Sequence, residues 1–251
     1  TEPAATEPAA TEPAATEPTA AVTVQSDSTL EHDQIEIGKP VTWTETVDIP
    51  STVDNLVVEI PSDASNLSIE TATGETTNPL PLPAGTEIAL APLDNAALQD
   101  NGETKTVLVS EPGENIITFE TPAPYTIETE QSTGDAFQKT VTVTHDSALH
   151  YTDILSHSDI PESLVSQGAE FTLYWMVDGV KTDVTTNPTY NVQLVDTDSN
   201  GVANQMQWTI PQLSEQTFVI EGIILATHAQ HLDSARNVIS DVYDQIKTRD
   251  G

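Results

Sequence analysis

Residues 196–204 read DTDSNGVAN and carry oxygen-bearing side chains at a regular spacing. The spacing matches a D-x-D-x-N-G calcium loop, in which Gly201 at the sixth position allows a sharp turn. Such a loop coordinates Ca²⁺ through side chains at alternate positions and through the backbone carbonyl of its seventh residue. The predicted ligands are Asp196, Asp198, Asn200, the Val202 carbonyl and Asn204.

The later positions of this loop depart from a full calcium site. The ninth residue is Asn204, an amide, and the twelfth, which is a bidentate Glu in an EF-hand, is Gln207. Asp-Ser-Asn-Gly is also favourable turn chemistry without any metal. The sequence therefore leaves two interpretations, a weakened structural calcium site and a plain hairpin turn.

Two alternating apolar runs predict the strands that position the loop. Val192 and Leu194 precede it, and Met206 and Trp208 follow it with the two-residue period of a half-buried strand. We therefore expect a β-hairpin whose apolar face belongs to the core of its domain.

The charge balance is strongly acidic. The 251 residues include 7 Lys and Arg against 40 Asp and Glu, a formal net charge of −33. Such a surface repels phosphates and anionic lipid headgroups, so we expect neither nucleic acid nor a membrane as a partner. Because salt screens charges within about 3 Å at 1 M, the composition predicts a halophilic source, and an acidic calcium-rich surface layer predicts the same balance.

Three further features of the sequence limit the class of protein. The chain has no Cys, so its stability outside the cell would depend on packing and ions instead of disulfides. No apolar run approaches the roughly 20 residues that span a bilayer, which argues against direct membrane insertion. Thr1 is preceded by neither Met nor a signal peptide, which predicts a processed form or a piece of a longer protein.

The sequence predicts four segments. Residues 1–21 repeat TEPAA, and the regular prolines predict an extended stalk whose threonines could carry O-linked sugars. Residues 22–122 and 123–226 contain short β-branched runs separated by Pro, Gly, Asn and Asp, which predicts two tandem immunoglobulin-like β-sandwiches in an all-β chain. Residues 227–251 form the last segment.

An internal repeat supports the two sandwiches. Lys39–Thr44 resembles Lys139–Thr144, and Ile116–Glu120 resembles Gln216–Glu221, each pair about 100 residues apart. Two motifs with one period predict diverged domains of the same topology. The predicted strands include Val41–Ile49, Leu56–Ile60, Leu67–Thr71, Glu87–Leu90, Thr106–Val109, Ile116–Glu120, Phe171–Val177, Val180–Val184 and Gln216–Leu225, with Asp178-Gly179 as a hairpin turn.

The apolar period changes near the end of the chain. Steps of three and four residues predict one amphipathic helix over residues 227–247, with Thr227 and Gln230 in the pattern of a capping box. The apolar positions of this helix are Leu232, Ala235, Ile239, Val242 and Ile246. We expect the helix to pack against the second sandwich, a following module or another subunit.

The sequence has no recognisable catalytic motif. It lacks G-x-S-x-G, a Cys nucleophile and a glycine-rich phosphate loop. His145, His150 and His157 match no metal spacing, so we expect surface or half-buried histidines. With 40 acidic residues, no carboxylate pair stands out for glycoside hydrolysis. We therefore expect a protein that is not an enzyme.

Two kinds of covalent modification have candidate residues. Asn66-Leu67-Ser68 is an acceptor sequence for an N-linked glycan on an exported chain. Lys39 and Lys139 stand at apparently equivalent strand starts and are candidates for amide cross-links to Asn, although solvated edge lysines are the simpler interpretation.

Residues 120–251 resemble a module repeated in large secreted surface proteins of archaea. The resemblance lies in TPAPYTIE, VTVTHDSALHYTD, LYWMVDGVKTDVTTNP and VDTDSNGVANQMQWTIPQLSEQ, and it covers about half of the chain. It implies a cell-surface location, an array of β-sandwiches and no known chemistry. In relatives the ninth loop position is usually aspartate, where this chain has Asn204.

We expect an extracellular structural protein that assembles through its stalk, strand edges or terminal helix into a filament or layer. Its partners would be copies of itself or other surface modules. An alternative is a calcium-dependent adhesin or carbohydrate-binding module that uses Tyr174, Trp175 and Trp208, although these lie in the most apolar strands and fit a core better. A further alternative is a non-catalytic accessory region of a larger secreted protein.

Overall fold

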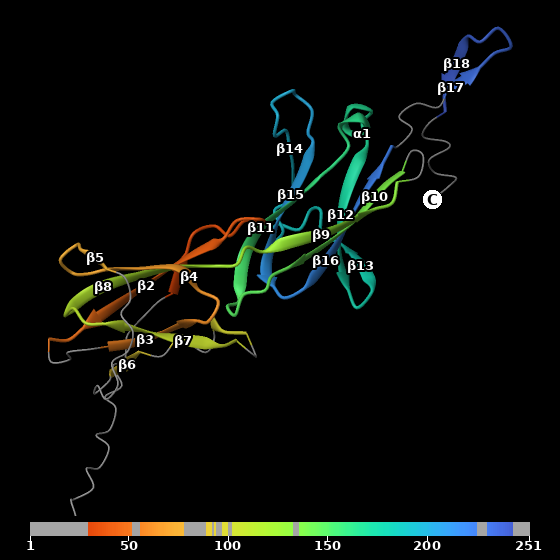
Figure 1. Cartoon of the computed structure of the whole chain (residues 1–251). Coiled ribbons are helices and arrows are strands. Elements are labelled where there is room, and N and C mark those ends of the chain that lie inside the picture. The colour runs from red at the N-terminus through yellow and green to blue at the C-terminus, as the bar shows by residue number, and fades with distance from the viewer. Residues whose placement is uncertain are drawn as a thin grey trace, which may run out of the picture.

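The computed structural model describes residues 30–51, 56–77, 89–91, 93, 97–99, 102–132, 136–224 and 230–242. These residues form mainly antiparallel sheets and one short helix, which confirms the all-β prediction (Figure 1). The predicted stalk over residues 1–21 lies outside the described residues. No helix within the described ranges has the length and apolar character to cross a membrane.

The strands between residues 30 and 121 form a first sandwich-like unit, module 1. One sheet has the strand order β1-β2-β8-β4-β5, and the other has the order β6-β3-β7. The strands are β1 (Leu30–His32), β2 (Val41–Ile49), β3 (Leu56–Pro61), β4 (Ser65–Glu70), β5 (Thr76–Thr77), β6 (Ala89–Ala91), β7 (Thr104–Val109) and β8 (Gly113–Thr121).

The alternation in β2 shows why this sequence forms a sheet with one buried face. Val41, Trp43, Val47 and Ile49 are buried, whereas the intervening threonines and Asp48 point away from the core. Glu45 is buried with the apolar set, as its place in the two-residue period requires. The core of module 1 therefore lies between its two sheets.

The strands between residues 125 and 223 form module 2. Its sheets have the orders β9-β10-β16-β12-β13 and β11-β15-β14. The elements are β9 (Tyr125–Glu130), β10 (Ala136–Thr144), β11 (Tyr151–Asp159), α1 (Glu162–Ser166), β12 (Glu170–Val177), β13 (Val180–Asp183), β14 (Gln193–Val195), β15 (Gln205–Leu213) and β16 (Gln216–Ile223).

The larger sheets of the two modules have the same strand order. The order β1-β2-β8-β4-β5 in module 1 becomes β9-β10-β16-β12-β13 in module 2, and β3 pairs with β7 as β11 pairs with β15. The modules differ in the third strand of the smaller sheet, because β6 lies parallel to β3 whereas β14 lies antiparallel to β15, at the opposite edge. The repeat motifs noted in the sequence fall on the central pairs β2–β8 and β10–β16.

The immunoglobulin-like topology is not confirmed. An immunoglobulin domain has the sheet orders ABED and CFG, with its last strand in the smaller sheet. In both modules the last strand, β8 or β16, lies instead in the centre of the larger sheet. The composition predicted short strands and turns but carried no information about this strand order.

The C-terminal helix prediction is wrong for residues 230–242. This range forms the antiparallel hairpin of β17 (Gln230–Leu232) and β18 (Val238–Asp241). Asp233 holds its turn by accepting hydrogen bonds from the backbone N–H groups of Ala235 and Asn237, both at 2.8 Å. Local Asx-turn chemistry therefore prevails over a helical apolar period. Residues 227–229 and 243–247 lie outside the described range.

Candidate functional site

Polar residues gather at three places on the described chain. The first is the junction between the two modules, the second is the 196–204 loop, and the third is a pocket beside Trp175.

A chain of hydrogen bonds crosses the module junction. The Trp43 indole N–H donates to Thr121 Oγ1 at 2.8 Å, and Thr121 donates in turn to the Tyr151 hydroxyl at 2.6 Å. The Tyr151 hydroxyl donates to the Pro122 carbonyl oxygen, also at 2.6 Å. Tyr151 is fully buried, and this burial raises the pKa of its hydroxyl, so it stays a donor. Each polar atom of this buried chain is satisfied across the junction.

Backbone pairing fixes the junction on one side. Leu155 of β11 donates to the Ile35 carbonyl at 2.8 Å, and Ile37 donates to the Leu155 carbonyl at 3.1 Å. Gly38 N–H donates to the Pro124 carbonyl at 2.8 Å. Ile35 is 1% exposed, and the buried residues of both modules form one continuous hydrophobic cluster. The modules thus share a core at this boundary.

The other side of the junction repeats this pattern. His150 N–H donates to the Ala97 carbonyl and Gln99 N–H donates to the Ala148 carbonyl, both at 2.9 Å. Asp63 accepts from the Ala148 N–H at 3.2 Å. A cavity of about 590 Å³ lies beside these contacts, lined by both modules. Because backbone hydrogen bonds join the modules on two sides of the junction, neither side can act alone as a hinge.

His145 lies against the junction and stacks on Tyr151 with ring centroids 4.3 Å apart. Burial lowers the pKa of His145 below 6.5, a shift that the Leu213 carbonyl at 3.3 Å partly offsets. His145, His150 and His157 are all half-buried, as predicted. The imidazole of His145 therefore packs as part of the junction, and its protonation would destabilise the contact between the modules.

The 196–204 loop forms the predicted hairpin between β14 and β15. Asp196 accepts hydrogen bonds from Gly201 N–H at 2.7 Å and from Asn200 N–H at 3.2 Å. The bond from Gly201 is the main cause that lowers the pKa of Asp196. Gly201 has φ of +92°, a conformation that favours glycine. The Asp196 carboxylate thus holds the two ends of the turn together through these backbone hydrogen bonds.

The predicted ligands converge only in part. The Asn200 side-chain nitrogen lies 3.0 Å from Asp198 Oδ2 and 3.2 Å from Glu162 Oε2, so two carboxylates meet at one point. Asn204 Oδ1 turns instead to the N–H and hydroxyl of Thr197, both at 3.0 Å. The described residues contain no group of three His, Cys, Asp or Glu side chains arranged to hold a metal.

Gln207 and Val202, two further positions of the calcium-loop pattern, take part in hydrogen bonds within the hairpin. Gln207 lies within β15, where its side chain donates to Gln205 at 2.8 Å. Asn200 Oδ1 accepts from the Val202 N–H at 2.8 Å. Met206 and Trp208 are core residues as predicted, but Leu194 is exposed on the short edge strand β14.

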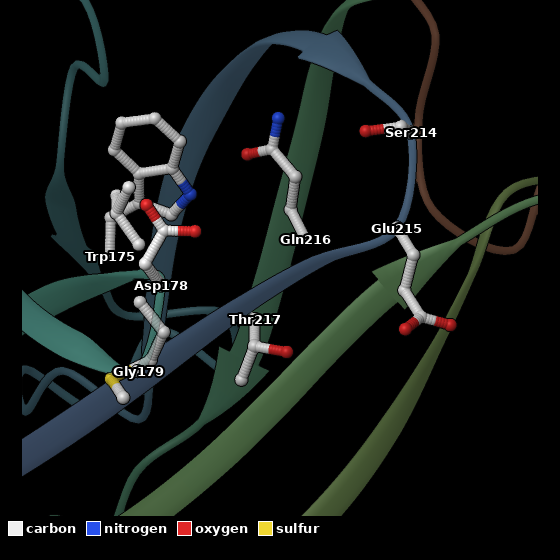
Figure 2. A pocket seen from close by; sticks show the side chains of 9 residues that line it. Trp175, Asp178, Gly179, Ser214, Glu215, Gln216 and Thr217 are labelled. Carbon is white, nitrogen blue, oxygen red and sulfur yellow. The ribbon is translucent and has the colours of Figure 1, made fainter.

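A pocket of about 480 Å³ lies beside the Trp175 ring on the larger sheet of module 2. Figure 2 shows the indole on one side and Gln216 and Glu215 on the other, with the Asp178 carboxylate close to the ring. Trp175 is half-buried, so its ring is accessible from this side. An aromatic face with nearby carboxylate and amide groups can stack on a sugar ring and bind its hydroxyls.

The other aromatic candidates differ from Trp175. Trp208 is fully buried and packs on Phe218 with ring centroids 5.5 Å apart, so it belongs to the core. Tyr174 is half-buried on the opposite face of β12, and Lys181 lies over its ring. Only Trp175 therefore lines the pocket in Figure 2.

The candidate cross-link lysines occupy unlike positions. Lys39 precedes β2, is exposed, and pairs with Glu36 at 2.5 Å. Lys139 lies within β10 and is 7% exposed, with its amine 2.6 Å from the Asp159 carbonyl and 3.3 Å from Glu128. No Asn side chain is among these partners in the described part of the chain. The amide cross-link stays a prediction.

Asn66 lies on an exposed bulge of β4. It has φ of +48°, and the register with β8 shifts between Ser65 and Ser68. Its side-chain nitrogen donates to Glu120 at 2.6 Å. The acceptor nitrogen is therefore at the surface, where a glycan could be attached.

Comparison of the sequence with family models and with curated proteins finds no match.

No sequence pattern indicated two residues that the structure places at these sites, Glu162 and Tyr151. Glu162 meets the loop only because α1 lies beside it, 38 residues earlier in the chain. Tyr151 acquires its place through contacts with Thr121 and Pro122. No local pattern marked either residue, since both act through tertiary contacts.

Proposed function

We propose that this chain is an extracellular structural protein of an archaeal cell surface, in which tandem sandwich-like modules act as stiff spacers. The buried junction between the modules carries this proposal. Contacts between domains of one chain usually resemble transient interfaces and allow relative motion. Here the Tyr151 hydrogen-bond chain and backbone pairing on two sides oppose that motion.

Assembly would use the open edges of the sheets. β9, β13 and β14 lie at sheet edges, and Ile127 on β9 is 57% exposed. Main-chain pairing of an extended segment with such an edge gives affinity, while side chains along the edge select the partner. We propose copies of this chain or other surface modules as partners. Salt would screen the repulsion between their acidic surfaces.

Cryo-electron microscopy of envelope material from the source cells tests this role. An antibody to module 2 should label regular filaments or a layer at the cell surface. Labelling confined to the cell interior, or to free monomers in the medium, would contradict the proposal.

Calcium at the 196–204 loop would stiffen one corner of the spacer. Glu162 adds a carboxylate that compensates in part for Asn204 and Gln207. At low ionic strength, Ca²⁺ should raise the melting temperature relative to EDTA, and Glu162→Gln should reduce the shift. Glu170→Gln, on exposed β12 surface, serves as the matched control. An equal midpoint with Ca²⁺ and EDTA would argue against a structural ion.

A carbohydrate-binding adhesin is the second candidate, favoured by the half-buried Trp175 in its pocket. Titration with a panel of neutral oligosaccharides should quench Trp175 fluorescence and shift the amide signals of Ser214–Thr217. Trp175→Ala should abolish these shifts, and Tyr125→Ala, an exposed aromatic elsewhere, should retain them. Identical titrations of all three proteins would exclude this site.

Covalent modification would suit an exported spacer, and intact mass measures it directly. We propose an N-linked glycan at Asn66, which would add sugar mass that Ser68→Ala removes. An amide cross-link from Lys39 or Lys139 to an Asn side chain would subtract ammonia. A native mass equal to the sequence mass would exclude both modifications.

A further inference from the structure

The hairpin β17–β18 lies beyond module 2 and belongs to neither module (Figure 1). Leu232, Val238 and Ile239 are 45%, 56% and 58% exposed, so its apolar residues have no core to pack in within the described chain. An isolated two-stranded hairpin is at best marginally stable in water. These exposed residues therefore call for a partner.

The repeat in the chain indicates what this hairpin is. Each module ends with the central strand of its larger sheet, β8 or β16, and in both cases an antiparallel hairpin follows. Residues 122–124 lead from β8 to β9–β10, and residues 224–229 lead from β16 to β17–β18. The second strands β2, β10 and β18 start at residues 41, 136 and 238, a spacing of about 100 residues.

The two hairpins also share their connection. Residues 131–135 join β9 to β10, and residues 233–237 join β17 to β18, five residues in each case. In β17–β18 the turn is held locally, because Asp233 N–H also donates to the Asn237 carbonyl at 2.9 Å. The hairpin thus has a formed turn, and only its packing partner is lacking in the described chain.

Module 2 shows what would cover such a hairpin. There, β10 pairs with β16 along its length, and Phe137, Val141 and Val143 of β10 are buried against the rest of the module. The strand β18 has Val238 and Ile239 at its start, and among the described residues only β17 pairs with it.

We propose that β17–β18 is the opening hairpin of a third module of the same repeat. Its partner is the remainder of a sandwich: one strand that pairs with β18 as β16 pairs with β10, and a second sheet that covers the face carrying Leu232 and Val238. This inference rests on the proposed spacer function, because it assigns a structural role to a row of three or more such modules.

A chimeric extension of the chain tests this partner. Residues 1–246 are followed directly by residues 145–224, so that the nine residues from Val238 replace β10 in front of the rest of module 2. We expect the added residues to fold and the amides of 230–232 and 238–241 to gain protection from hydrogen exchange on the order of 100-fold. Val238→Lys with Ile239→Lys in the same chimera should abolish that protection.

The matched control carries residues 1–229 followed by 125–224, which supplies module 2 with its own opening hairpin. If this control folds while the first chimera leaves the added residues unprotected, the inference is overturned. It is also overturned if hairpin protection in the unextended chain rises with concentration and is lost in the double-Lys variant, because a second copy would then be the partner. Absence of the protein from the cell surface would refute the spacer function and leave the exchange result standing.

Discussion

Tyr151 is the residue through which the two modules depend on each other most directly. Its hydroxyl accepts from Thr121 and donates to the Pro122 carbonyl within a buried site. Tyr151→Phe leaves that carbonyl and the Thr121 hydroxyl without their partner, so we expect the free energy of unfolding to fall by about 1–3 kcal/mol. Urea denaturation measures this loss. Tyr125→Phe, whose exposed hydroxyl lies 3.4 Å from Asp146, should change stability little, and an equal loss in both variants would contradict the role of the buried chain.

His145 makes the junction sensitive to pH. Because burial lowers its pKa in the folded protein below 6.5, the unfolded chain binds the proton more readily. Stability should therefore be full above about pH 6.5 and decline as the pH falls from there towards the lower folded pKa. His145→Phe keeps a ring beside Tyr151 and should flatten this part of the stability curve. His231→Gln on the exposed hairpin is the control, and an unchanged slope in His145→Phe would exclude this mechanism.

Asp196 should respond to pH in a lower range. Its pKa is lowered below 3.8, chiefly by the hydrogen bond from Gly201 N–H, so the loop bonds persist above 3.8 and are lost as the pH falls through the folded pKa. Asp196→Asn removes one acceptor at every pH. Amide exchange of Asn200 and Gly201 should therefore accelerate at neutral pH in this variant, but not in Asp48→Asn on β2. Equal exchange in wild type and Asp196→Asn would contradict the loop description.

At the scale of elements, the alternation of residue types predicted strands well. The predicted run Val41–Ile49 is β2 itself, and Asp178 and Gly179 both have positive φ in the turn between β12 and β13. The short edge strands and α1 were not predicted, because the apolar residues in them show no clear two-residue or helical period. Strand order could not be predicted, since it depends on which runs pair across long stretches of sequence.

The hairpin β17–β18 shows where a periodicity argument fails. Ala235 and Ile239 fit a helical stripe, but Asp233 satisfies backbone donors two and four residues later and stabilises a turn. Asp233→Ala removes these acceptors, so we expect residues 230–232 and 238–241 to lose their extended chemical shifts. Carbon chemical shifts by NMR measure this directly. Retained strand shifts in Asp233→Ala would mean that the turn does not depend on this side chain.

At the scale of the whole molecule, the sequence predicted two repeated units but not how they meet. The motif pairs lie on corresponding strands, but Lys39–Thr44 begins at β2 whereas Lys139–Thr144 ends β10, so the two lysines differ in position and in burial. The junction is formed by residues from separate loops, such as Ile35, Gln99 and Tyr151, whose partners lie far away in sequence. Only the folded arrangement brings them together.

We propose that modules 1 and 2 form one stiff unit through their buried junction. Residual dipolar couplings of backbone amides in weakly aligned protein measure the orientation of each module independently. We expect the couplings of residues 30–121 and 125–223 to fit a single alignment tensor of one magnitude, with the module orientation of Figure 1. Two tensors of clearly different magnitude would show that the modules move independently and that the junction is not stiff.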